Sequence, residues 1–334
     1  MRKSRRTIPV PLVSALLLLM AASAVAQDLF GVLGDPVAAQ VERIYTKGLK
    51  HLLATQQKNG AWRSSYGEQP GVIGLAILAM LAYGEDPDFG PCSKAIRTGV
   101  EAILDQASPT GYLGNSMYNH GFATLALAEV YGMVDDDRVG PALQKAVDLL
   151  LNSQKQNPYG AWRYSPESKD ADTTVSGACM VALLAARNAG VAVPQEAIDR
   201  GLQYFRSCAA TGGGFGYTSP DGPNGARSAI GALVFALAGQ QKDDACIASV
   251  NFLKARLDRT ERSYYHYYLY YMGQAMFRND MEAWRRWDSI NLKRLSSSQR
   301  DDGSWKGSHG DTFSTSAALL SLALNYRFLP IYER

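Results

Sequence analysis

A run of aromatic side chains over residues 264–271 is the densest group in this sequence that could contact a ligand. The run reads Tyr-Tyr-His-Tyr-Tyr-Leu-Tyr-Tyr. On a helix, consecutive side chains point in different directions, so some of these rings must face the interior. Aromatic faces suit an extended apolar ligand and attract cations, although core packing with hydrogen-bonded hydroxyls explains the run equally well. The candidate ligand-binding residues of the run are Tyr264, Tyr265, His266 and Tyr268.

Polar residues also stand where several apolar segments begin. Asn119-His120, Arg227 and Asp311 are the examples. If these segments are helices whose first residues meet in space, the polar groups converge beside the positive ends of the helix dipoles. Such a place suits a polar or anionic head group. We therefore add His120, Arg227 and Asp311 as candidate ligand-binding residues, while His120 alone fits a structural histidine equally well.

The four cysteines have no spacing typical of a redox or metal site. They are Cys92, Cys179, Cys208 and Cys246, and none belongs to a CxxC pair. One or two disulfides are an alternative in an exported protein, with Cys208–Cys246 the favoured pair. We prefer to interpret the cysteines as small core residues.

The elements that position these residues follow a repeat. Segments 56–62, 156–162 and 299–305 have the form QxxxGxW, and degenerate copies lie at 106–112 and 213–217. The copies recur at about 50 residues, which leaves an interval for an eroded copy near Tyr264. Each copy lies between two segments with helical periodicity.

The two helices of each pair differ in composition. The first carries charges on one face, as with Lys47, Lys145 and Arg200, whereas the second is apolar nearly all round. Alternating half-exposed and buried helices predict two concentric rings, an all-α fold that is a single (α/α)6 toroid of six helix pairs. The expected outer helices are 37–57, 92–106, 139–154, 195–208, 243–257 and 281–298, and the inner ones are 71–83, 118–131, 174–189, 227–238, 264–277 and 312–326.

Residues 1–26 have the pattern of a signal peptide. A basic start is followed by an apolar run over 12–22 and by Ala24-Val25-Ala26, so cleavage is expected before Gln27. The expected domains are the signal peptide 1–26, a short lead 27–34 and the toroid 35–334, with export to the periplasm or medium and no transmembrane span after cleavage. Without residues 1–26, which hold four Lys/Arg and no Asp/Glu, 34 − 4 = 30 basic residues face 31 acidic ones. This balance gives no indication of a nucleic-acid partner.

The repeats and alternating helices resemble those of the terpenoid cyclase and protein prenyltransferase superfamily, in particular bacterial squalene–hopene-cyclase-like (prenyltransferase and squalene oxidase repeat) proteins. The resemblance covers residues 35–334. It implies that the Gln and Trp of each motif tie an outer helix to the next inner one: Gly allows the tight turn, Gln supplies hydrogen bonds and Trp covers apolar surface. The residues given this structural role are Gln56, Trp62, Gln156, Trp162, Gln299 and Trp305.

The resemblance also implies a catalytic hypothesis. Class II cyclases of that superfamily use the middle carboxyl of a DxDD motif as a general acid, and Asp170-Ala171-Asp172-Thr173 matches all but the last position. By position Asp172 would be the acid and Asp170 its neighbour. The alternative is helix capping, because Asp-Thr recurs at Asp311-Thr312 and Asp is a preferred N-cap residue. Capping is the interpretation we prefer.

Other chemistries of related toroids do not match. Protein prenyltransferases use Asp, Cys and His as zinc ligands, and His266 has no suitably placed Asp-x-Cys beside it. Thioester toroids need a GCGEQ motif, which this sequence lacks. No cofactor or metal is therefore expected.

Three functions are compatible with these features. The leading hypothesis is an exported toroid that binds an apolar or extended ligand, for example an isoprenoid, or a partner protein, in or at the mouth of the ring. The second is a terpene-cyclase-type isomerase with Asp172 as general acid. The third is a protein-interaction scaffold whose axis is filled by side chains. The volume of the lumen distinguishes it from the other two, because a filled axis leaves no pocket.

Overall fold

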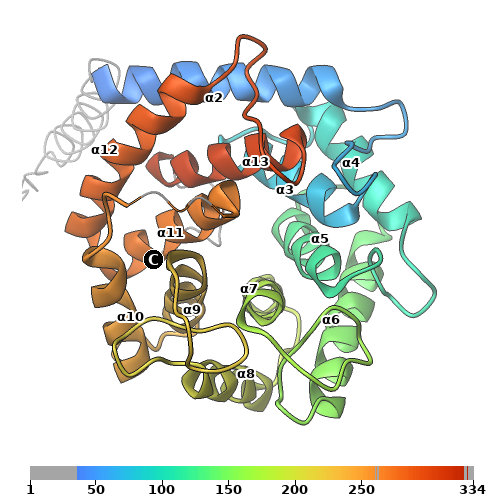
Figure 1. The fold of residues 1–334 in the computed structure, drawn as a ribbon. Helices are drawn as coiled ribbons and strands as arrows, with labels where there is room; N and C mark the ends of the chain where they lie inside the picture. Colours follow the sequence, from blue (N-terminus) through green and yellow to red (C-terminus); the bar gives the residue numbers. More distant parts are fainter. Residues whose placement is uncertain (1–35, 260, 262, 327–328, 330–334) are drawn as a thin grey trace, which may run out of the picture. The chain divides into compact units, whose positions relative to one another are not determined.

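The computed structural model describes residues 36–259, 261, 263–326 and 329 (Figure 1). The chain divides into two compact units, Met1–Ile44 and Tyr45–Arg334. Of the first unit only residues 36–44 are described, and they begin helix α2 (Pro36–Thr55). The predicted signal peptide and lead, residues 1–34, lie outside the described residues.

The described residues form twelve α-helices and a short 3-10 turn, with isolated bridges in place of strands. The outer helices after α2 are α4 (Ser93–Asp105), α6 (Val139–Gln156), α8 (Gln195–Ser207), α10 (Asp244–Lys254) and α12 (Met281–Ser298). The inner helices are α3 (Pro70–Leu81), α5 (Met117–Val130), α7 (Thr173–Asn188), α9 (Gly225–Leu237), α11 (Tyr265–Asn279) and α13 (Asp311–Leu322). The all-α toroid predicted from the sequence is confirmed. None of the described helices is long and apolar enough to cross a membrane.

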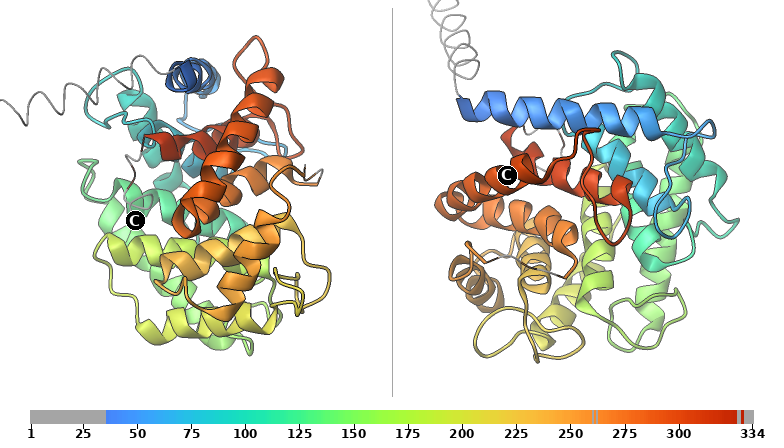
Figure 2. Two further views of the ribbon diagram at one scale, coloured as in Figure 1. Left: turned by 90° about the vertical axis from the view of Figure 1, so that its left-hand side faces the viewer. Right: turned by 45° about the horizontal axis from the view of Figure 1, so that its top comes forward.

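The six inner helices of the unit Tyr45–Arg334 form a closed ring. Each contacts the next in chain order from α3 to α13, and α13 contacts α3 (Figure 1). Outer helices α4, α6, α8, α10 and α12 each contact an inner helix, and α12, for example, lies beside α11 and α13 (Figure 2). Two hydrogen bonds connect the first helix pair with the last. Lys47 Nζ donates to the Arg300 carbonyl (2.8 Å), and Thr312 Oγ1 donates to the Arg63 carbonyl (3.0 Å).

Burial explains why the inner helices lack a polar face. All twelve residues of α3 are buried, because α3 packs against neighbours in the inner ring and α4 outside it. Small residues allow these helices to approach closely. At Gly74 of α3, a Cβ atom would lie 2.9 Å from the Phe122 carbonyl oxygen of α5, so only glycine fits at this spacing.

The repeat turns are held as the motif predicts in the first and last copies. Gln56 Nε2 donates to the carbonyls of Gly60 and Ala95 (both 2.9 Å), and Gln299 Nε2 donates to that of Gly303 (2.9 Å). The motif tryptophans are buried and donate their indole N–H to the preceding outer helix, at 2.8 to 3.0 Å. These bonds join Trp62 to Leu52, Trp162 to Leu150 and Trp305 to Leu295.

In the third copy a different glutamine makes the bond that the motif assigns to its Gln. Gln156 is exposed, whereas Gln154 is fully buried and its Nε2 donates to the Ala197 carbonyl of α8 (2.8 Å). The predicted structural role of Gln156 is therefore wrong. Helix α6 continues to Gln156, so the side chain that points to α8 comes two residues earlier.

Candidate functional site

A cavity of about 810 Å³ lies where the inner helices begin. Its lining includes residues from the start of every inner helix: Gly71 of α3, Asn119 of α5, Thr174 of α7, Arg227 of α9, Tyr267 of α11 and Phe313 of α13. The cavity therefore lies beside six helix N-termini, whose backbone N–H groups carry partial positive charge. This volume is within the range of small-molecule sites, about 300–1,000 Å³.

Amide side chains connect α3 and α5 at the rim of the cavity. The Asn119 amide donates to Gln69 Oε1 (2.8 Å) and to Asn115 Oδ1 (3.1 Å), and Gln69 Nε2 donates to the Tyr66 carbonyl (2.7 Å). These bonds fix the orientation of the amides, so the rim is a preorganised polar surface.

Aromatic rings form another part of the rim. The His309 ring stacks on Tyr264 (centroids 5.5 Å apart, planes at 14°) and also contacts Tyr66 (5.8 Å) and Phe313 (5.1 Å). Tyr264 has φ 55°, in the left-handed region that non-glycine residues rarely adopt. Burial lowers the pKa of His309 below its ordinary value, which favours the neutral ring.

Apolar groups also line the cavity. Val72 of α3 and Phe313 of α13 lie in the first turns of their helices, and Leu75 of α3 and Phe122 of α5 lie about one turn further along. Behind Phe122, Tyr270 packs edge-on against its ring (5.8 Å). The cavity thus has polar groups at the helix starts and an apolar wall about one turn further in.

Arg227 is the only Lys or Arg among the described residues that line the cavity, and no Asp or Glu lines it. Its Nη1 donates to the Gly222 carbonyl (2.8 Å), and its guanidinium lies over the Tyr217 ring (5.1 Å). Glu261 accepts a bond from the first N–H of α9 (2.9 Å) but is not part of the lining. The charge of the lining is therefore positive.

Asp172 lies behind this lining. It is fully buried and is the N-cap of α7, as the capping interpretation predicts: its Oδ1 accepts from the N–H groups of Thr174 (2.8 Å) and Val175 (2.9 Å). Its Oδ2 lies 3.3 Å from Arg163 Nε, and Arg163 also pairs with the exposed Asp170 (3.3 Å). Burial raises the pKa of Asp172, while the bonds from Thr174 and Val175 and the charge of Arg163 act against this rise.

Of the ligand-binding candidates, Tyr264 and Arg227 line the cavity, whereas Tyr265, His266, Tyr268, His120 and Asp311 do not. His120 is fully buried: its Nδ1 accepts from the Leu113 N–H (3.1 Å) and its Nε2 bonds to the Ala146 carbonyl (3.0 Å). Burial lowers its pKa to about 4. It is a structural histidine, since it connects the second repeat turn to α5 and α6.

Two expectations for Asp311, a place in the ligand site and a role as N-cap, are wrong. It is the first residue of α13 and its side chain does not cap that helix, whose N-cap is Gly310. Its carboxylate pairs with Arg300 (2.6 Å), beside the repeat turn. The second Asp-Thr pair is therefore not equivalent to Asp172-Thr173.

Five tyrosines of the lining were not among the candidates: Tyr66, Tyr118, Tyr164, Tyr217 and Tyr267. Tyr267 belongs to the aromatic run. Tyr164 and Tyr217 follow the aromatic residue of their repeat turn, Trp162 or Phe215, by two positions, and their hydroxyls bond to each other (2.6 Å). A comparison of the turns two residues beyond each motif would have found this pair.

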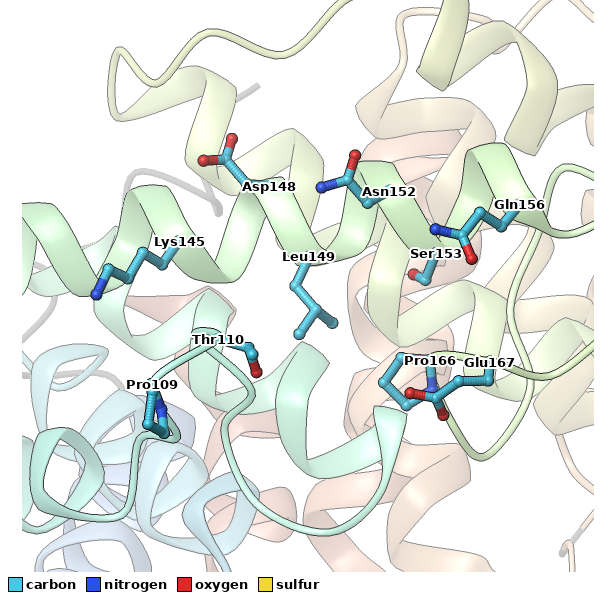
Figure 3. Close-up of a pocket in the computed structure, with 10 residues that line it drawn as sticks. All are labelled: Pro109, Thr110, Lys145, Asp148, Leu149, Asn152, Ser153, Gln156, Pro166 and Glu167. Carbon is cyan, nitrogen blue, oxygen red and sulfur yellow. The ribbon is translucent and has the colours of Figure 1, made fainter.

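A second, smaller hollow lies on α6 (Figure 3). It measures about 340 Å³, and Lys145, Asp148, Leu149, Asn152 and Gln156 of α6 line one side of it. Two loops supply the other side, through Pro109 and Thr110 and through Pro166 and Glu167 (Figure 3). Its mixed charges lie side by side on an outer helix, away from the inner-helix starts that form the main cavity.

All four cysteines are free and buried, so the alternative Cys208–Cys246 disulfide is absent and the core interpretation is confirmed. In the part of the chain that the structure describes, no three His, Cys, Asp or Glu side chains gather in a way that could hold a metal ion.

A family model described as "Domain of unknown function (DUF6288)" matches residues 41–329. The chain belongs to this family. Among proteins with curated descriptions, none matches the sequence. The match covers all of the described toroid after residue 40, and the description of the family names no activity.

Solved structures with a similar fold include two enzymes. Type II terpene cyclase MstE from Scytonema superposes with a TM-score of 0.62 at 18% identity, over 85% of this chain and 97% of that chain. An MstE variant was solved with its substrate, geranylgeranyl dihydroxybenzoate (TM-score 0.61, 16% identity, 86% and 98% covered). The GH76A α-1,6-mannanase from Salegentibacter sp. HEL1_6 superposes with a TM-score of 0.63 at 7% identity, over 85% and 98%. At these identities the similarity shows the toroid fold alone.

Proposed function

We propose that this DUF6288 protein is a ligand-binding toroid whose cavity takes an amphiphilic molecule with an extended apolar tail and an anionic head group. One observation carries the proposal: a cavity of about 810 Å³ has a positively charged, polar rim and an apolar wall further in. An anionic head group fits beside Arg227 and the six helix N-termini, where no lining carboxylate among the described residues opposes it. The tail fits against Val72, Leu75 and Phe122.

The comparisons support the same class of ligand. The substrate of MstE, geranylgeranyl dihydroxybenzoate, joins an isoprenoid tail to an acidic aromatic head. A similar ligand suits the rim and wall of this cavity. The narrower likeness to squalene–hopene-cyclase-like proteins remains a prediction.

The geometry gives less support to the alternatives. A terpene-cyclase isomerase with Asp172 as general acid needs that carboxyl in contact with the substrate, but Thr174 lines the cavity in front of it. Hydrolysis of a glycosidic bond commonly uses two facing carboxyl groups, and no Asp or Glu belongs to the described lining. A scaffold whose axis is filled by side chains would leave no space of this volume.

Equilibrium binding to the purified protein tests the proposal with three probes: geranylgeranoic acid, geranylgeraniol and mannotriose. We expect saturable 1:1 binding of the acid, weaker binding of the alcohol, and none of mannotriose. Arg227→Met should weaken binding of the acid by about tenfold and that of the alcohol little, because only the acid carries a negative charge that pairs with the guanidinium. A preference for mannotriose, or no saturable binding of either amphiphile, would contradict the proposal.

Arg286→Met is the matched control, since Arg286 is exposed on outer helix α12. It removes the same charge from the molecule without changing the cavity. Equal losses in both variants would mean that the acid responds to net charge and not to Arg227.

We also propose that residues 1–26 direct export of the protein. N-terminal sequencing of the protein recovered from the periplasm or medium should give a chain that starts near Gln27. Recovery of the full chain from the cytoplasm alone would contradict this.

A further inference from the structure

A hydrogen-bond chain runs from the cavity wall to the buried Asp172. The Tyr118 hydroxyl bonds to Thr174 Oγ1, and Thr174 Oγ1 donates to Asp172 Oδ1 (2.5 Å). Tyr118 and Thr174 both line the cavity, on α5 and α7. Tyr267 of α11 joins them, since its hydroxyl donates to the Thr174 carbonyl (3.2 Å).

The direction of this chain follows from Asp172. Its Oδ1 already accepts two backbone N–H groups, which can only donate, so Oδ1 carries no proton whatever the state of the carboxyl. The Thr174 hydroxyl must therefore give its single hydrogen to Oδ1. Because that hydrogen is committed, Thr174 can only accept from Tyr118, and the Tyr118 hydrogen is committed in turn.

Two tyrosine hydroxyls thus have lone pairs but no free hydrogen. The Tyr267 hydrogen is committed to a carbonyl, and the Tyr118 hydrogen to Thr174. The two rings are neighbours, with centroids 6.3 Å apart. This part of the wall offers acceptors, whereas Arg227 on α9 offers only donors.

We infer that Tyr118, directed by Thr174 and Asp172, forms with Tyr267 an acceptor subsite that selects ligands carrying a hydroxyl group. The inference rests on the proposed function and narrows it: the ligand is a hydroxylated amphiphile, with its anionic group at Arg227 and a hydroxyl donor at Tyr118. A ligand group that can only accept meets lone pairs at this subsite and gains no bond.

A pair of probes with one difference tests the subsite. Geranylgeraniol has one hydroxyl donor, and its methyl ether has none. We expect the wild-type protein to bind the alcohol about five- to tenfold more tightly than the ether. Tyr118→Phe should reduce this ratio to about two or less, mainly by weakening binding of the alcohol.

Thr174→Val tests the direction of the chain. It keeps the Tyr118 hydroxyl but removes the acceptor of its hydrogen, so Tyr118 becomes free to donate. The ether should then bind more tightly than it does to wild type, an effect that simple loss of packing would not produce. Tyr159→Phe is the control, because Tyr159 is 59% exposed and lies outside the cavity lining.

The outcomes separate the two proposals. Tight binding of both probes with a ratio near one in wild type would overturn the acceptor subsite and leave the amphiphile cavity standing. An unchanged ratio in Tyr118→Phe would also overturn it. Failure of geranylgeranoic acid, the alcohol and the ether to bind would overturn both.

Discussion

At the scale of single residues, replacement of Asp172 should cost far more stability than replacement of Asp311. Asp172→Ala removes the N-cap of α7 and leaves Arg163 without its buried partner. We expect a loss of about 2–4 kcal/mol in the free energy of unfolding. Asp311→Ala removes a half-exposed ion pair and should cost under about 1 kcal/mol. Urea denaturation of both variants measures the difference.

The same pair of variants tests whether Asp172 stabilises the start of α7. If Asp172→Ala were as stable as Asp311→Ala, the capping role would be refuted despite the bonds to Thr174 and Val175. Asp172→Asn keeps an oxygen for these bonds and should lose less stability than the alanine variant.

Asp288 of α12 should make stability depend on pH. It is 6% exposed, and burial raises its pKa to about 7, against a smaller opposing effect of a bond from Asn325. Because the folded-state pKa is above that of the unfolded chain, the folded state binds the proton more tightly. Its unfavourable contribution is therefore absent below about pH 4, grows as the pH rises, and is complete above about pH 7.

Asp288→Asn should remove this dependence. The variant should be more stable than wild type at pH 8, by on the order of 1–4 kcal/mol, and nearly equal to it at pH 4. The difference between the two unfolding free energies at each pH is the quantity to measure. Buried histidines such as His120 make both proteins less stable as the pH falls. This effect is the same in both, so it cancels in the difference. A difference independent of pH would contradict the prediction.

The side chains of the site were only partly predictable. Arg227 and Tyr264 were found because polar and aromatic residues stood at the expected helix starts. His120 and Asp311 met the same criterion but turned away, since one bonds to Ala146 and the other pairs with Arg300. The sequence predicts which helix turn a residue occupies. It does not predict whether the side chain faces the cavity or bonds to a neighbouring element.

At the scale of elements, the two glutamines at the end of α6 offer a matched test of the repeat turn. Gln154→Ala removes a fully buried amide that donates to Ala197 and accepts from Arg200 (3.3 Å). We expect it to lower the free energy of unfolding by about 1–3 kcal/mol. Gln156→Ala changes an exposed side chain and should stay within about 0.5 kcal/mol of wild type. Chemical denaturation distinguishes them, and a larger loss in Gln156→Ala would restore the role that the motif assigns.

The helices themselves were largely predictable, because their evidence is distributed over many residues. The outer helix Met281–Ser298 begins and ends as expected, and α3 begins one residue before the expected Gly71. Amphipathic and fully apolar segments alternate all along the chain, and each is long enough for its period to be recognised. The error at Gln156 arose where helix α6 ends at Gln156, two residues beyond the expected end at 154.

At the scale of the unit Tyr45–Arg334, the closed inner ring makes one site out of six distant parts of the sequence. Every inner helix begins at the same cavity, so each repeat contributes one or a few residues to its lining. A repeat protein of this kind can change ligands by substitutions at the helix starts while the buried helix bodies keep the ring intact. The polar rim and the apolar wall are thus consequences of one architecture.

A ligand in this cavity should stabilise the inner ring as a whole. With geranylgeranoic acid at 100 times its dissociation constant, mass action gives about 2.7 kcal/mol. Hydrogen exchange followed by mass spectrometry should show slower exchange in the first turns of all six inner helices, because all six contact the ligand site. Exchange at the hollow on α6, residues 145–156, should slow less than in these first turns, which provides an internal control (Figure 3). Protection confined to one helix pair, or to α6, would mean that the acid binds elsewhere and that the ring does not respond as a unit.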